Sequence, residues 1–246
     1  MKRLSHLLFA LLLAWALSAP AQILPGILAA PAAVVSVGTV SLNNNNSGSI
    51  LYAASNTVSG AQSVTAGGTH TVAFAYVKVR YLSGTPTITS VTYNGASMTL
   101  GCQTLDATNH YRTAVYYLVA PATGSNTLAA TGDANVTNIY ASLASYNGVD
   151  QTTPIRACAT PFTGTSSSTN SITVASDAND LTSTLASDGN NTITSTNQTS
   201  DGITNTGCCD LGLDHATTAA ASVTHTWTWA TGVGTAAIIG WSIKHD

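Results

Sequence analysis

The chain has 246 residues, a formal net charge of −3 and only 7% charged side chains, and none of its acidic residues is glutamate. An average globular protein has roughly 25% charged residues. The few lysines and arginines form no cluster, which argues against nucleic-acid binding. A zinc protease of the H-E-x-x-H type is excluded without glutamate, and no G-x-S-x-G motif marks a serine hydrolase.

The N-terminus has the three parts of a secretory signal peptide. Lys2 and Arg3 precede an apolar run over residues 7–17, and residues 19–21 (APA) form a small-residue cleavage site. The apolar run is about 11 residues long, whereas a membrane-spanning helix needs roughly 20. We therefore expect residues 1–21 to be removed and the mature chain to be secreted or displayed on the cell surface, with no membrane span.

Residues 22–58 are predicted to form an apolar arm followed by an asparagine-rich linker. Pro25 and Pro31 disfavour a helix over residues 22–37, and NNNNSG (43–48) is polar and turn-forming. An apolar extended segment freed by signal cleavage could add as a strand to a neighbouring subunit. The alternatives are that the arm folds onto its own sheet or that later cleavage removes part of it. The candidate donor residues are Ile23, Leu24, Ile27, Leu28, Val34, Val35 and Val37.

From about residue 50, β-rich runs alternate with turns. Asn94-Gly95 predicts a tight hairpin, and residues 150–169 are predicted to be a loop. Turn signals recur about every 8–12 residues without an amphipathic helix, which favours an antiparallel sandwich or barrel. We expect one β-sandwich domain over residues 59–246. The expected strands are 71–82, 87–93, 96–100, 112–119, 127–131, 137–146, 171–175, 181–187, 192–197, 221–229 and 234–244.

Four cysteines remain after signal cleavage. An even number of cysteines in a secreted chain favours disulfides. Because adjacent cysteines bridge each other only with strain, we expect Cys208 and Cys209 to pair separately with Cys102 and Cys158. The alternative is a thiolate metal site, but no C-x-x-C spacing supports it.

Two acidic segments could bind metal ions. Asp177, Asn179 and Asp180 offer three oxygen-bearing side chains, as a calcium site requires, but an Asx turn between strands is the favoured interpretation. Asp210 and Asp214 lie near His215, where a disulfide-pinned loop is favoured over a metal site or a catalytic triad. We therefore expect no catalytic residues and no cofactor.

Aromatic residues provide a candidate glycan site. His225, Trp227 and Trp229 alternate, so they share one face of a strand. If exposed, this face could stack on sugar rings, whereas a buried face would belong to the core, which is favoured. The candidate platform residues are Tyr116, Tyr117, Trp227 and Trp229.

Four segments resemble a group of secreted bacterial and phage-associated jelly-roll-like β-sandwich modules. They are SVTYNGASM (90–98), VYYLVAPATGSNTL (115–128), ASYNGVDQTTPI (144–155) and IIGWSIK (238–244). The resemblance implies a jelly-roll-like sandwich in an extracellular or virion-surface protein and brings no catalytic residues with it. The four cysteines and the apolar arm depart from the group's pattern.

The sequence thus predicts a non-catalytic secreted structural protein, a component of a cell surface, an extracellular filament or an adhesive layer. Its expected partners are further copies of itself or other surface proteins, assembled by N-terminal strand donation. The alternative is a carbohydrate-binding module that uses exposed aromatic residues.

Overall fold

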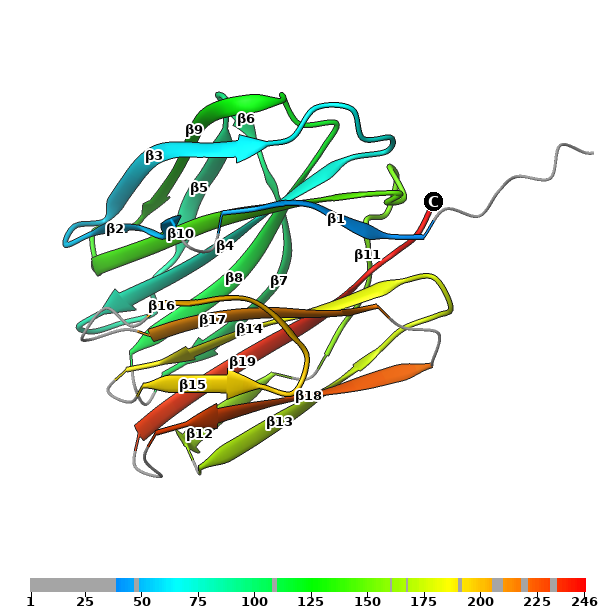
Figure 1. The fold of residues 1–246 in the computed structure, drawn as a ribbon. Coiled ribbons are helices and arrows are strands. Elements are labelled where there is room, and N and C mark those ends of the chain that lie inside the picture. Colours follow the sequence, from blue (N-terminus) through cyan, green and yellow to red (C-terminus); the bar gives the residue numbers. More distant parts are fainter. Residues whose placement is uncertain are drawn as a thin grey trace, which may run out of the picture. The chain divides into compact units, whose positions relative to one another are not determined.

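The computed structural model describes residues 39–46, 49–107, 110–159, 161–166, 168–189, 192–204, 210–217, 221–230 and 234–246. The predicted signal peptide and strand-donor residues, and Cys208 and Cys209, lie outside these ranges. The described residues form antiparallel strands and no α-helix (Figure 1), which confirms the all-β class. No helix among them is long and apolar enough to cross a membrane.

The first ten strands form a two-sheet unit, which we call the N-terminal sandwich. Its large sheet has the order β1-β10-β4-β8-β7, with β2 also beside β10, and its small sheet has the order β3-β9-β5-β6. The strands are β1 (Ser41–Asn45), β2 (Leu51–Ala53), β3 (Thr57–Val64), β4 (Val72–Tyr81), β5 (Ile88–Tyr93), β6 (Ala96–Ser97), β7 (Thr99–Asp106), β8 (Tyr111–Val119), β9 (Gly124–Gly132) and β10 (Val136–Asn147).

The remaining strands form a second two-sheet unit, the C-terminal sandwich. Its large sheet has the order β11-β19-β14-β17-β16, with β12 also beside β19, and its small sheet has the order β13-β18-β15. The strands are β11 (Ile155–Cys158), β12 (Phe162–Ser166), β13 (Thr169–Ala175), β14 (Leu181–Asp188), β15 (Ile193–Thr196), β16 (Thr199–Thr204), β17 (Asp210–Thr217), β18 (Ser222–Trp229) and β19 (Gly234–Ile243).

The two sandwiches share one topology. The large sheets correspond strand by strand, as β1-β10-β4-β8-β7 and β11-β19-β14-β17-β16. The small sheets correspond as β3-β9-β5 and β13-β18-β15. Within each sandwich, the first two strands pair with the last and the third with the last but one, which is the jelly-roll arrangement. The jelly-roll prediction is confirmed, and residues 59–246, predicted as one sandwich, contain most of two.

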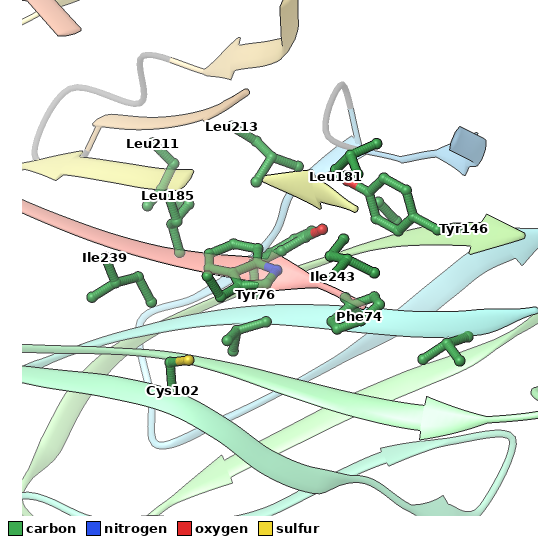
Figure 2. Packing of buried hydrophobic residues seen from close by; sticks show 14 of the residues in the cluster. Phe74, Tyr76, Cys102, Tyr146, Leu181, Leu185, Leu211, Leu213, Ile239 and Ile243 are labelled. Carbon is green, nitrogen blue, oxygen red and sulfur yellow. The ribbon is translucent and has the colours of Figure 1, made fainter. Parts of the chain in front are cut away.

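Three apolar layers hold the four sheets together. One layer fills each sandwich between its large and small sheets, and a third lies between the two large sheets. In this third layer (Figure 2), Phe74 and Tyr76 of β4 meet Leu181 and Leu185 of β14. Because the large sheets are covered on both sides, every residue of β14 is buried. The stack therefore runs small sheet, large sheet, large sheet, small sheet.

The asparagine-rich segment is not the linker that the sequence predicts. Residues 41–45 form β1, which pairs with β10 from Ser41 opposite Asn147. Asparagine has low β propensity, but Asn43 and Asn46 bind the main chain of residues 63–65 through their side-chain amides. The segment is ordered by these contacts rather than by intrinsic propensity.

Two other segments predicted as loops are strands. Residues 150–169 contain β11 and β12, and both pair with β19. Asp210 and His215 lie on β17, between β14 and β16. These strands are specified by their long-range partners, which local propensity does not report. The Asn94-Gly95 hairpin is confirmed, because it joins β5 to β6 with φ values of 49° and 78°.

Candidate functional site

A groove lies beside the junction of the two sandwiches, and we call it the joint groove. It has a volume of about 290 Å³. Leu100, Gly101 and Tyr117 line it from the N-terminal sandwich, and residues 153–158 line it from the C-terminal sandwich. The Leu100 side chain is 41% exposed there, so the groove offers an apolar and aromatic surface to solvent.

A disulfide closes one side of the joint groove and corrects the predicted cysteine pairing. Cys102 of β7 bonds Cys158 of β11, with 5.8 Å between their Cα atoms, and Cys158 also lines the groove. The two strands can approach because residue 101 is glycine. A Cβ atom there would lie 2.2 Å from Cδ1 of Ile155. The bond therefore ties one sandwich covalently to the other.

Removing this disulfide is expected to destabilise the protein. The bridge closes a separation of 56 residues, and loop-closure entropy gives about 4 kcal/mol for a loop of that size. We expect a variant with both Cys102→Ser and Cys158→Ser to unfold at a clearly lower urea concentration than the wild type. Equal midpoints, with the wild-type bond verified by mass spectrometry, would show that the bond contributes nothing to stability.

Asp180 is the centre of a polar cluster at the start of β14. Its side chain is 0% exposed and accepts hydrogen bonds from Arg156 Nε at 2.5 Å, Ser242 Oγ at 3.0 Å and the His245 main-chain N–H at 3.1 Å. Burial alone would raise the pKa of the Asp180 carboxyl, but the hydrogen bonds from Arg156 and His245 outweigh it and hold that pKa well below its usual range. The carboxylate thus joins β11, β14 and the segment after β19.

The predicted calcium candidates belong to this cluster. Asp177 binds the Arg156 guanidinium at 2.8 Å, so one arginine serves both carboxylates. Asn179 has a φ of 71°, and the Asp180 N–H donates to the Asp177 main-chain carbonyl at 3.2 Å, so residues 177–180 form a main-chain turn. Among the described residues, no three histidine, cysteine or aspartate side chains are grouped as a metal site would require.

Asp150 forms a second, half-buried ionic pair, and this pair leads us to expect that the stability of the fold falls in acid. The Lys244 ammonium donates to its carboxylate at 2.6 Å, and the main-chain N–H groups of Thr152 and Thr153 add two hydrogen bonds. The Lys244 hydrogen bond is the largest of the effects that lower the pKa of Asp150 from 3.8 to about 2.

A carboxyl group whose pKa is lower in the folded state stabilises the fold above its unfolded pKa, and this contribution is lost as the pH falls through the folded pKa. We expect the urea midpoint to fall between about pH 4 and pH 2, and Asp150→Asn to reduce that fall. If the urea midpoint of Asp150→Asn fell by as much as that of the wild type over this pH range, Asp150 would not be a source of the acid sensitivity.

A buried network replaces the predicted loop around His215. His225 Nδ1 lies 2.8 Å from Oδ1 of Asp214, and His225 Nε2 lies 2.9 Å from Thr182 Oγ1. Aspartate, histidine and hydroxyl follow one another as in a catalytic triad, but all three residues are fully buried inside the C-terminal sandwich. His215 instead pairs with Asp201 at 2.7 Å. The arrangement is therefore a hydrogen-bonded network within the core of the C-terminal sandwich.

This network was not evident from the sequence. Asp214 and His225 lie on different strands, 11 positions apart, and the nearby His215 was the more obvious partner. The usable signal in the sequence was the alternation along residues 222–229, which places His225 on the same face as Trp227 and Trp229. In the structure this face is the buried one.

The predicted aromatic platform is mostly core. Trp227 is 0% exposed, Trp229 2% and Tyr116 8%. Trp227 Nε1 donates to Thr184 Oγ1 at 2.9 Å, and its ring packs on Gly212, where a Cβ atom would lie only 2.4 Å from it. Tyr117 differs from the other three, because it is partly exposed and lines the joint groove.

Comparisons with known proteins name no family. No protein family and no curated protein matches the chain. Among solved structures, the crystal structure of dimeric latent PorU from Porphyromonas gingivalis matches 85% of this chain and 22% of that chain, with 8% sequence identity and a TM-score of 0.27. The chain therefore spans about a fifth of that protein's length, and a likeness this low supports no inference about function.

Proposed function

We propose that the chain is a non-catalytic secreted structural protein, a component of a cell surface, an extracellular filament or an adhesive layer. The observation that carries the proposal is the continuous packing of four sheets with a disulfide across the junction of the two sandwiches. The disulfide agrees with the signal peptide expected from residues 1–21, because such bonds persist outside the reducing cytosol.

The ionisable groups support a structural role. Asp150 binds Lys244, Asp180 binds Arg156, and Asp214 binds His225. The paired residues lie 94, 24 and 11 positions apart in the sequence, so each pair joins two different segments of the fold. Catalysis needs such groups to converge on a cleft that a substrate can reach, whereas these pairs connect different segments of the fold. The resemblance to secreted jelly-roll modules points in the same direction.

The assembly proposed for this protein is N-terminal strand donation by residues 22–37. The test compares the secreted full-length protein with a variant that lacks these residues, by electron microscopy. The deletion stops before Val40, because that residue is buried and its N–H donates to the Asn179 carbonyl. We expect assemblies from the full-length protein alone. Indistinguishable particles from both proteins would end the strand-donation idea.

The joint groove favours a second candidate function, binding of a neutral glycan. Ligand sites are concave, largely apolar pockets at interfaces between units, and Tyr117 offers a ring on which a sugar could stack. A glycan array should show selective binding that Tyr117→Ala abolishes. The control is Tyr52→Ala, which removes a 49% exposed ring on β2, at the opposite edge of the same sheet. Equal binding by both variants would exclude the groove.

A further inference from the structure

Strand β13 is an edge of the small sheet in the C-terminal sandwich. Its flanks show which main-chain groups face β18, because Trp229 N–H donates to the Ser168 carbonyl at 3.0 Å and Ser176 N–H to the Ala221 carbonyl at 2.9 Å. Hydrogen-bonded pairs alternate along an antiparallel ladder. The main-chain groups of Ser171, Thr173 and Ala175 therefore point away from β18, and within the described ranges no hydrogen bond to them is found.

The equivalent edge in the N-terminal sandwich is covered. There, β3 takes the place of β13, and side chains from the β1 region stand in for a neighbouring strand. Asn46 accepts from the Ser63 N–H at 3.1 Å and donates to the Ser63 carbonyl at 2.8 Å. Asn43 binds both main-chain groups of Thr65 in the same way, at 3.0 and 3.2 Å. Two strands with the same place in the fold thus differ in whether their edge is capped.

β13 also lacks the usual protection against strand addition. Proteins block edges with charged residues, proline, bulges or very short strands. The sequence of β13 is TNSITVA, without charge or proline, and its pairing with β18 continues over all seven residues without a bulge. β-branched residues predominate, which favours an extended strand. This edge is a template for one more strand.

We propose that the β13 edge is the acceptor for the N-terminal arm, residues 22–37, of a second copy of the chain. This inference rests on the proposed strand-donation function and names its binding site. The arm has 16 residues and spans roughly 50 Å when extended, and it leads directly into Thr39, where the described chain begins.

The chemistry of the two segments is complementary. Neither the arm nor β13 contains a charged side chain, so main-chain hydrogen bonds and apolar contacts supply the affinity. Val35 and Val37 alternate around Ser36, so they can extend the inner face of Ile172 and Val174 while Ser36 faces solvent. A contact between the arm of one copy and the edge of the next is head-to-tail, so its repetition gives a filament unless the rotation between copies closes a ring.

The test replaces Thr173 with proline in the full-length secreted protein, with Thr173→Ala as the matched control. Both changes remove the Thr173 hydroxyl bond to Thr224, 3.0 Å long. Only proline removes the outward N–H, and proline is tolerated on an edge strand whose N–H faces solvent. We expect Thr173→Pro to lower binding of a fluorescent peptide of residues 22–38 by about tenfold or more and to shorten filaments. Thr173→Ala should leave both unchanged.

The outcomes separate this inference from the proposed function. If Thr173→Pro assembles as well as Thr173→Ala while deletion of residues 22–37 stops assembly, strand donation stands and the β13 acceptor is wrong. If no protein assembles, the proposed assembly fails and peptide binding decides: binding lost only in Thr173→Pro supports the acceptor, and equal or absent binding overturns it.

A second measurement covers the case in which Thr173→Pro does not fold. In the variant that lacks residues 22–37, whose β13 edge has no arm to accept, hydrogen exchange at Ser171, Thr173 and Ala175 should slow when the peptide is added, because their outward amides become donors to the new strand. Unchanged exchange at all three amides would overturn the inference.

Discussion

Replacing Trp241 with alanine is expected to lower the free energy of unfolding by about 3–5 kcal/mol. Trp241 lies on β19, is 0% exposed and belongs to the apolar layer between the two large sheets. Its ring packs on Tyr76 of the N-terminal sandwich, with 5.5 Å between the ring centroids. The loss therefore removes contacts that join the sandwiches. Urea denaturation followed by circular dichroism measures it, with Tyr52→Ala as a surface aromatic control.

The shape of that unfolding curve matters as much as its midpoint. Because β4 and β14 are each covered on both faces, we expect the sandwiches to unfold together in a single transition in the wild type. The contrary result is two separate transitions in the wild type, of which Trp241→Ala shifts only one. That result would show that each sandwich is stable independently and that the apolar layer between them contributes little.

Replacing Asp214 with alanine is expected to cost a similar amount, about 3–5 kcal/mol, because it removes the hydrogen-bond partner of several buried groups, and each group left unsatisfied costs about 1–3 kcal/mol. Asp214 and His225 are both 0% exposed. Thr184 also donates to the Asp214 carboxylate, at 2.5 Å, and would lose its acceptor. Thermal and urea unfolding of the purified variant measure the loss.

The matched control is Asp177→Ala. Asp177 forms an ionic pair with Arg156, but its side chain is 62% exposed, and exposed pairs contribute at most about 1 kcal/mol. If Asp214→Ala proves no more destabilising than Asp177→Ala, the buried network is not part of what holds the C-terminal sandwich together.

Much of the fold could be predicted from local patterns. The Asn94-Gly95 turn, the long β-rich run of β4 and the threonine-rich alternation of β18 all depend on interactions between near neighbours. Turn spacing then favoured antiparallel sheets and a sandwich. These features correctly indicated the all-β class and the antiparallel sheets, whereas the jelly-roll-like topology was implied by the resemblance to secreted modules.

What could not be predicted depends on partners far away in the sequence. Five of the eight residues of β14, LTSTLASD, are polar, yet the strand is entirely buried because hydroxyls such as those of Thr182 and Ser183 find partners on other strands. The Cys102–Cys158 pairing depends on how β7 and β11 meet, and the coverage of β3 by Asn43 and Asn46 depends on the β1 register. The duplicated topology has no repeated motif to reveal it.

The most direct test of a structural, self-associating role is the mass of the native secreted protein in sedimentation velocity. We predict large, polydisperse particles that persist at high salt, because the described β13 edge and the arm contain no charged residue to be screened. A single species with the mass of one chain at every concentration would contradict the account.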